Sequence, residues 1–171
     1  MDLTIIQNLA DQLDIHLDRY QKLIDFLNQE RHCLLGLDLD GLLKISQSKE
    51  AVAIGIRESI ERLTESVTQA GLMLGLPEGQ TPTLAEVAAH CPKPFDNRIN
   101  DGAIKLARLK NVIAMENDAN RNFIEYSLGL INESLNVLTG ADQVKADGYR
   151  KDGRKDTSLK KALPAKLSKE V

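Results

Sequence analysis

Apolar side chains recur over residues 3–35 at alternating steps of four and three, the spacing of a heptad seam on a long packed helix. The seam consists of Leu13, Leu17, Tyr20, Ile24, Leu27, Arg31 and Leu34. Gly36 suits the residue that follows a helix end, and Asp38 suits the N-cap of the next helix. A first helix is therefore expected over about residues 3–35, followed by a sharp turn.

A second apolar stripe predicts a helix over about residues 39–74, which should end near Gly75. Its members are Val52, Ile56, Ile60, Leu63, Val67, Ala70 and Leu74. Because the turn before this helix is short, we expect the first two helices to pack as an antiparallel hairpin.

Prolines and glycines interrupt regular structure over residues 75–95. One short helix is expected inside this stretch, over about residues 84–91, because Thr83 and Glu86 have the spacing of a capping box.

A third long helix is expected over about residues 97–138, with Asp96 as its N-cap and Gly140 beyond its end. Its apolar stripe consists of Ile99, Leu106, Leu109, Ile113, Ile124, Leu128, Ile131, Leu135 and Leu138. Three polar residues, Glu116, Asn117 and Asn120, occupy the middle, where the stripe should pass.

These elements predict an all-α fold: an elongated antiparallel three-helix bundle or coiled-coil hairpin, with a short extra helix and a flexible C-terminal tail. The low aromatic content of 4% and the absence of Trp favour long packed helices over a β-sandwich. We expect the bundle to span residues 1–139. Residues 140–171 lose the apolar periodicity and carry more Lys and Arg than Asp and Glu, so they are expected to form a flexible basic tail.

The formal net charge of -3 gives no support for nucleic-acid binding. No long uninterrupted apolar stretch occurs, so we expect neither secretion nor membrane insertion. We expect a cytoplasmic location instead. The two cysteines, Cys33 and Cys91, are far apart in the sequence and are expected as free thiols.

Two patterns suggest chemistry. Asp38 and Asp40 lie in a D-x-D-G string typical of phosphatases, but such an aspartate follows a buried strand, whereas Asp38 here follows a predicted helix and suits its N-cap role. The dipeptides His32-Cys33 and His90-Cys91 contain zinc-ligand residue types, yet adjacent residues on a helix point about 100° apart and converge poorly on one ion. We therefore expect no enzyme activity, no metal and no cofactor.

The third predicted helix carries the most specific pattern. An Asn pair, Asn117 and Asn120, precedes two apolar residues, Phe123 and Ile124, and then a leucine-rich run. This pattern resembles the C-terminal helix of the FlgN family of flagellar chaperones, although Arg121 stands where a small residue is expected.

Further segments extend the resemblance over nearly the whole chain. The segment Tyr149–Arg154 is similar to a Y-G-x-D-G segment of that family, with Arg150 in place of the first Gly, and residues 39–50 resemble its second helix. The resemblance implies a cytoplasmic chaperone without enzyme activity. It would bind the C-terminal helices of the hook-associated junction proteins and deliver them to the export gate of the flagellar type III apparatus.

On this hypothesis an apolar stripe late in the third helix covers the client. The partner-binding residues are then Ile124, Leu128, Ile131, Leu135 and Leu138 for the client, Tyr149 for the gate, and Asn117 and Asn120 either to fix register or to mark where the partner surface begins. Alternatives remain: the stripe packs on the first two helices, the chain is a general helical adaptor or scaffold, or it is a D-x-D-G phosphatase. A homo-oligomer is also left open.

Overall fold

The computed structural model describes residues 3–77 and 79–139, and every regular element in these ranges is an α-helix. The elements are α1 (Leu3–Gly36), α2 (Leu39–Met73), α3 (Leu84–His90) and α4 (Phe95–Thr139). The predicted all-α class is confirmed. The chain divides by its contacts into one unit up to Ile124 and a second unit from Glu125, and each is described by itself.

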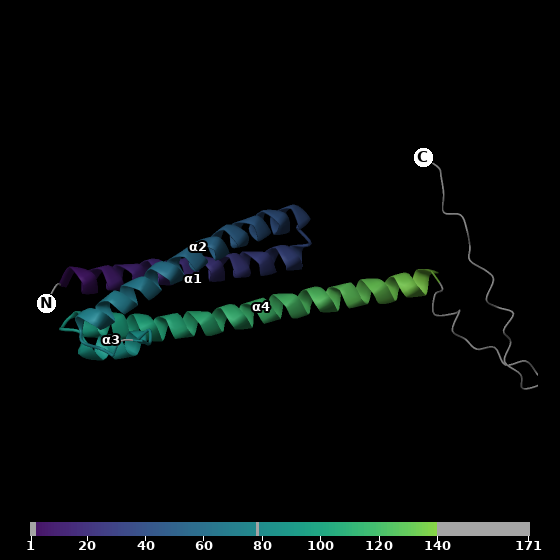
Figure 1. The fold of residues 1–171 in the computed structure, drawn as a ribbon. Helices are drawn as coiled ribbons and strands as arrows, with labels where there is room; N and C mark the ends of the chain where they lie inside the picture. The colour runs from purple at the N-terminus through teal and green to yellow at the C-terminus, as the bar shows by residue number, and fades with distance from the viewer. Residues whose placement is uncertain (1–2, 78, 140–171) are drawn as a thin grey trace, which may run out of the picture. The chain divides into compact units, whose positions relative to one another are not determined.

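In the first unit α1 and α2 form an antiparallel hairpin (Figure 1). Asn8 Nδ2 donates to Ser66 Oγ at 3.2 Å near the open end of the hairpin. Lys49 Nζ lies 2.7 Å from Glu30 Oε2 near the turn. The contacts thus advance along α1 while they move back along α2, as the short connection requires.

The core of the first unit gathers around α1. It contains Ile6, Leu9, Ala10, Leu13, Leu17, Tyr20 and Ile24 of α1, Leu63, Val67 and Ala70 of α2, Val87 and Ala88 of α3, and Ile99, Leu106 and Leu109 of α4. The burial predicted for the α1 seam is confirmed from Leu13 to Leu27. The prediction for Ile60 of α2 was wrong: its side chain is exposed and Ser59 is buried in its place, because the Ser59 hydroxyl meets the His16 ring of α1.

The first part of α4 packs along α1 and runs parallel to it (Figure 1). Arg98, near the start of α4, pairs with Asp11 at 2.9 Å, and Asn120 hydrogen-bonds to the carbonyl oxygen of Leu27 at 2.9 Å. Higher residue numbers on α4 therefore meet higher residue numbers on α1.

Gly102 permits the close approach of α4 to α1. A Cβ atom at this position would lie 2.5 Å from Leu13 Cδ2, which is closer than real Cβ atoms come to a neighbour. A leucine of the opposite helix thus fills the space that a side chain at Gly102 would occupy, in keeping with the dense packing of protein interiors.

The turn between α1 and α2 differs from the sequence prediction in one residue. Asp38 caps α2 as predicted, since its Oδ1 accepts from the Gly41 backbone N–H at 2.9 Å. The prediction that Gly36 follows the helix end was wrong, because α1 includes Gly36 and the positive φ of 54° falls on Leu37.

The capping box before α3 is confirmed: Thr83 Oγ1 accepts from the Glu86 backbone, and the Glu86 carboxylate accepts from the Thr83 backbone. The N-cap predicted at Asp96 was wrong, because α4 already begins at Phe95. Asp96 lies in the first turn instead, where its negative charge interacts favourably with the positive end of the helix dipole.

Candidate functional site

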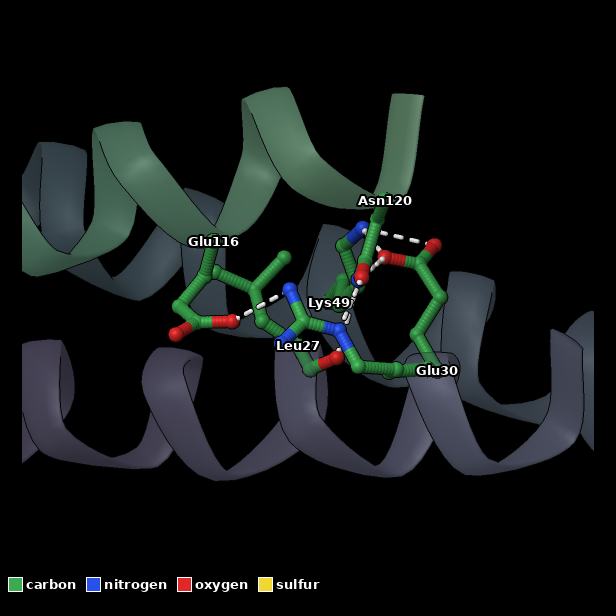
Figure 2. A network of polar contacts seen from close by, with 6 residues as sticks. Leu27, Glu30, Lys49, Glu116 and Asn120 are labelled. Carbon is green, nitrogen blue, oxygen red and sulfur yellow. Dashed lines mark hydrogen bonds and ion pairs between the residues drawn. The ribbon is translucent and has the colours of Figure 1, made fainter. Parts of the chain in front are cut away.

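The polar residues in the middle of α4 meet the end of the α1–α2 hairpin (Figure 2). Asn120 is only 3% exposed and uses its whole amide. Its Nδ2 donates to the Leu27 carbonyl oxygen at 2.9 Å and to Glu30 Oε2 at 3.0 Å, while its Oδ1 accepts from Arg31 Nε at 3.1 Å. A buried side-chain amide that is satisfied in this way allows only one alignment of its helix against the neighbour.

Two ion pairs complete this group, which we call the Asn120 cluster: Leu27, Glu30, Arg31, Lys49, Glu116 and Asn120. Lys49 Nζ of α2 lies 2.8 and 2.7 Å from the two Glu30 carboxylate oxygens. Arg31 Nη2 lies 2.6 Å from Glu116 Oε2, and both atoms are shielded from solvent, so each depends on the other for compensation of its charge. The cluster therefore joins α1, α2 and α4 through charged and amide groups.

The two members of the Asn pair differ in position. Asn117 is exposed, whereas Asn120 is the last buried residue of α4. Ile124, one turn beyond Asn120, is already 39% exposed. Full burial of α4 side chains within the first unit thus ends at the Asn120 cluster.

The described part of the second unit is the end of α4, residues 125–139. Four aliphatic side chains recur there at steps of three and four, so they lie on one face of the helix. They are Leu128, Ile131, Leu135 and Leu138, each more than half exposed, and we call them the α4 apolar row. These are four of the five client contacts predicted from the sequence, and the fifth, Ile124, is the last residue of the first unit. Tyr149, which is predicted to contact the export gate, lies outside the described residues.

A family model described as FlgN protein matches residues 1–157 of the chain. The chain belongs to the FlgN family. No curated protein and no solved structure matches it. FlgN proteins are flagellar export chaperones that bind hook-associated proteins, and the family is not a family of enzymes. None of the described helices is long and apolar enough to cross a membrane.

The aspartates of the D-x-D-G string have helical surroundings in this FlgN chain. Asp38 lies between α1 and α2, and its carboxylate is bonded to the start of α2. Asp40 lies in the first turn of α2. The strand that precedes the nucleophile in phosphatases of this kind is thus replaced by α1.

The two His-Cys pairs of the FlgN chain lie on different elements, one near the end of α1 and one at the end of α3. Partial burial raises the pKa of the Cys33 thiol, with a further contribution from Asp38, and raises the pKa of Cys91 with a contribution from Asp96. A protonated thiol is a poor metal ligand. Residues 3–77 and 79–139 contain no group of three or more His, Cys, Asp or Glu side chains that could hold a metal ion.

Three features of this surface were not predicted from the sequence. The ion pair between Arg31 and Glu116 was not predicted, because the position of Glu116 opposite α1 depends on how the helices pack. The exposed apolar residues Tyr126, Leu130 and Val137 of α4 were not singled out. The exposure of the leucines around the α1–α2 turn was not predicted either.

Proposed function

We propose that this FlgN chain is a cytoplasmic chaperone whose α4 apolar row covers the C-terminal helices of the hook-associated junction proteins until they reach the export gate. Family membership supports the chaperone role. The observation that carries the assignment of the row is that Leu128, Ile131, Leu135 and Leu138 keep between 51% and 82% of their surface exposed.

The spacing of the row suits a helical client. Residues at steps of three and four form a continuous ridge, which packs into the groove of a second amphipathic helix. Covering the exposed part of each aliphatic side chain contributes about 1 to 2 kcal/mol. A few such side chains, less the entropy lost on association, support a complex that forms and dissociates reversibly, as delivery requires.

The Asn pair has two roles in this proposal. Asn120 is a positioning residue, because its buried amide fixes where the packed part of α4 ends. Asn117 is exposed three residues earlier and offers its amide to the polar rim of the client. Ile124, which is partly exposed, extends the apolar row toward the Asn120 cluster.

Tyr149 is proposed as the contact with the export gate. An aromatic residue in a polar segment offers a large contact area at a low cost in side-chain entropy. Tyr149→Ala should leave client binding unchanged and reduce secretion of the client by cells. A loss of client binding in this variant would instead place Tyr149 in the client surface.

The test of the client surface is a matched pair of charge substitutions one residue apart. Leu135→Asp places a carboxylate within the apolar row, whereas Asn136→Asp places the same charge on a neighbouring polar position of the same turn. With a peptide of the C-terminal helix of a hook-associated protein, Leu135→Asp should raise Kd about tenfold or more, and Asn136→Asp should change it little.

Helical melting of both variants supplies the control. Because Leu135 is half exposed, neither substitution should lower the melting temperature appreciably. Equal loss of affinity in the two variants would show that net charge, not the row, decides binding. Absence of any complex with the unmodified chain would reject the client assignment and favour a scaffold role.

A further inference from the structure

The turn between α1 and α2 has an unusual backbone for its sequence. Leu37 N–H donates to the Leu34 carbonyl oxygen at 3.4 Å and Asp38 N–H donates to the Cys33 carbonyl oxygen at 3.0 Å, which is the Schellman pattern of a helix end. The residue with positive φ in this pattern is normally Gly, because a side chain there crowds the backbone. Here the residue is Leu37, although a glycine is its immediate neighbour in the chain.

The side chains around this turn are also unusually exposed. Leu35, Leu37, Leu39 and Leu43 are 63%, 83%, 76% and 63% exposed, and we call these four residues the hairpin tip. Single exposed aliphatic residues are common on protein surfaces, but a group of them marks an interaction surface. Leu37 is unfavourable to the free chain in two ways, by its backbone and by its exposure, so local stability does not explain its presence.

The packing below the hairpin tip indicates what kind of partner fits. Up to Leu27 the hairpin is covered by α4, whose last buried residue is Asn120. Beyond Leu27, α1 has no buried residue, and over residues 39–58 of α2 only Ile45 is buried. The α1–α2 pair thus continues past the buried part of its third helix, and a helix is the element that completes such a pair.

The charge around the hairpin tip indicates the flanks of that helix. Asp38 and Asp40 lie among the leucines of the hairpin tip, and the nearest Lys or Arg side chains in the sequence are Arg31, which pairs with Glu116, and Lys44. One oxygen of Asp38 accepts from the Gly41 backbone. Both carboxylates remain exposed beside the leucines and attract a cationic partner.

We propose that the hairpin tip binds a helix of a partner protein that carries Lys or Arg beside a leucine stripe. This surface lies in the first unit and shares no residue with the α4 apolar row. It gives the chaperone a second site, which does not need the client surface.

The experiment uses the full chain and a synthetic amphipathic helix of about 14 residues, built from Leu in heptad positions and Lys elsewhere. A second peptide has Glu in place of every Lys. Fluorescence anisotropy measures peptide binding. NMR shifts of the leucine methyl groups show where on the chain the peptide binds. The Lys peptide should bind and shift the methyl signals of the hairpin tip, and the Glu peptide should not.

Leu37→Gly separates binding from folding. Glycine relieves the positive φ, so the variant should melt at a higher temperature while its affinity for the Lys peptide at the tip falls about tenfold or more. Leu72→Ser is the matched control, because it removes a leucine with 53% exposure at the other end of α2 and should leave the affinity unchanged. Leu135→Asp shows how much peptide binds to the α4 apolar row and should leave the tip signals as they are.

Three results would overturn the proposal. If the Leu37→Gly variant binds the Lys peptide at its hairpin tip with unchanged affinity, Leu37 does not contact the bound helix. Equal binding of the Glu peptide would remove the charge preference. A concentration-dependent dimer in sedimentation that Leu37→Gly abolishes would show that a second copy of the chain covers the tip.

Discussion

The amide of Asn120 joins backbone and side-chain groups of α1 that are about ninety residues away in sequence. Its three hydrogen bonds satisfy the Leu27 carbonyl oxygen, one oxygen of Glu30 and the Nε of Arg31. An apolar residue here would leave these groups without their partner in a place that water reaches poorly. The Asn120 amide therefore contributes more to the free energy of unfolding than the burial of its own side chain would.

Asn120→Ala is expected to lower the free energy of unfolding by about 2 to 3 kcal/mol, because the groups of α1 lose a buried partner. Chemical denaturation followed by circular dichroism measures this change. Asn117→Ala is the control within the same pair: Asn117 is exposed, so its removal should change stability by less than about 0.5 kcal/mol. Similar losses in both variants would argue against a specific role for the cluster.

His16 is a second residue whose environment determines its behaviour. The Ser59 hydroxyl donates to the Ile56 carbonyl oxygen at 2.8 Å, so Ser59 Oγ accepts from the His16 Nδ1–H at 2.7 Å. The edge of the ring meets Tyr20 at a centroid distance of 4.7 Å. Burial, with the nearby positive charges of Lys110 and Arg19, lowers the pKa of His16 from 6.5 to about 4.

Acid should therefore destabilise the bundle through His16. The folded pKa is lower than the unfolded value, so the unfolded chain binds more protons, and the stability that neutral His16 contributes is lost as the pH falls from about 6.5 to about 4. The loss is up to about 3 kcal/mol. In denaturation at several pH values His16→Asn should flatten this part of the profile, while the exposed His90→Asn should retain it. An unchanged profile in His16→Asn would assign the acid sensitivity to other groups.

Among the elements, α4 combines two kinds of helix in one. Its first part carries Ile99, Leu106 and Leu109 into the core, and its last part, from residue 125, has no buried side chain among the described residues. The glycines of the two parts reflect the difference. Leu13 of α1 occupies the space where a Cβ atom of residue 102 would lie, whereas nothing lies within 4 Å of a Cβ atom built at Gly129.

Alanine at these two glycines should have opposite effects. Gly102→Ala forces a methyl group against Leu13 and should lower the free energy of unfolding by about 1 to 3 kcal/mol. Gly129→Ala meets no neighbour and should stabilise its part of the helix by up to about 1 kcal/mol. Denaturation measures the first effect, and slower amide exchange around residue 129 measures the second. Equal effects would mean that α4 does not approach α1 closely at Gly102.

The elements also show which features the sequence could predict. The heptad of α1, the N-cap at Asp38 and the capping box before α3 depend on neighbours in the sequence, so they could be read from it. The positive φ of Leu37 could not be predicted, because local rules place Gly at such a position and would assign it to Gly36. Ile60 was misassigned for a tertiary reason, since the His16–Ser59 hydrogen bond decides which side of α2 faces α1.

At the scale of the whole molecule, the all-α class follows from apolar periodicity, whereas the sites depend on what each helix meets after folding. Asn117 and Asn120 differ by less than one helical turn and look alike in the sequence, yet only Asn120 is buried. The aliphatic residues of α4 follow one helical period on both sides of its polar middle, but Leu109 is core and Leu135 is exposed. Periodicity locates a stripe and leaves open whether the chain itself covers it.

The position of the Asn120 cluster has a consequence for how such proteins diverge. Since no described side chain after Asn120 is buried, substitutions in that part of α4 should change the core of the first unit little. Residues before it are constrained by neighbours on two other helices. The two parts of this one helix should therefore differ in how many substitutions they tolerate without loss of the fold.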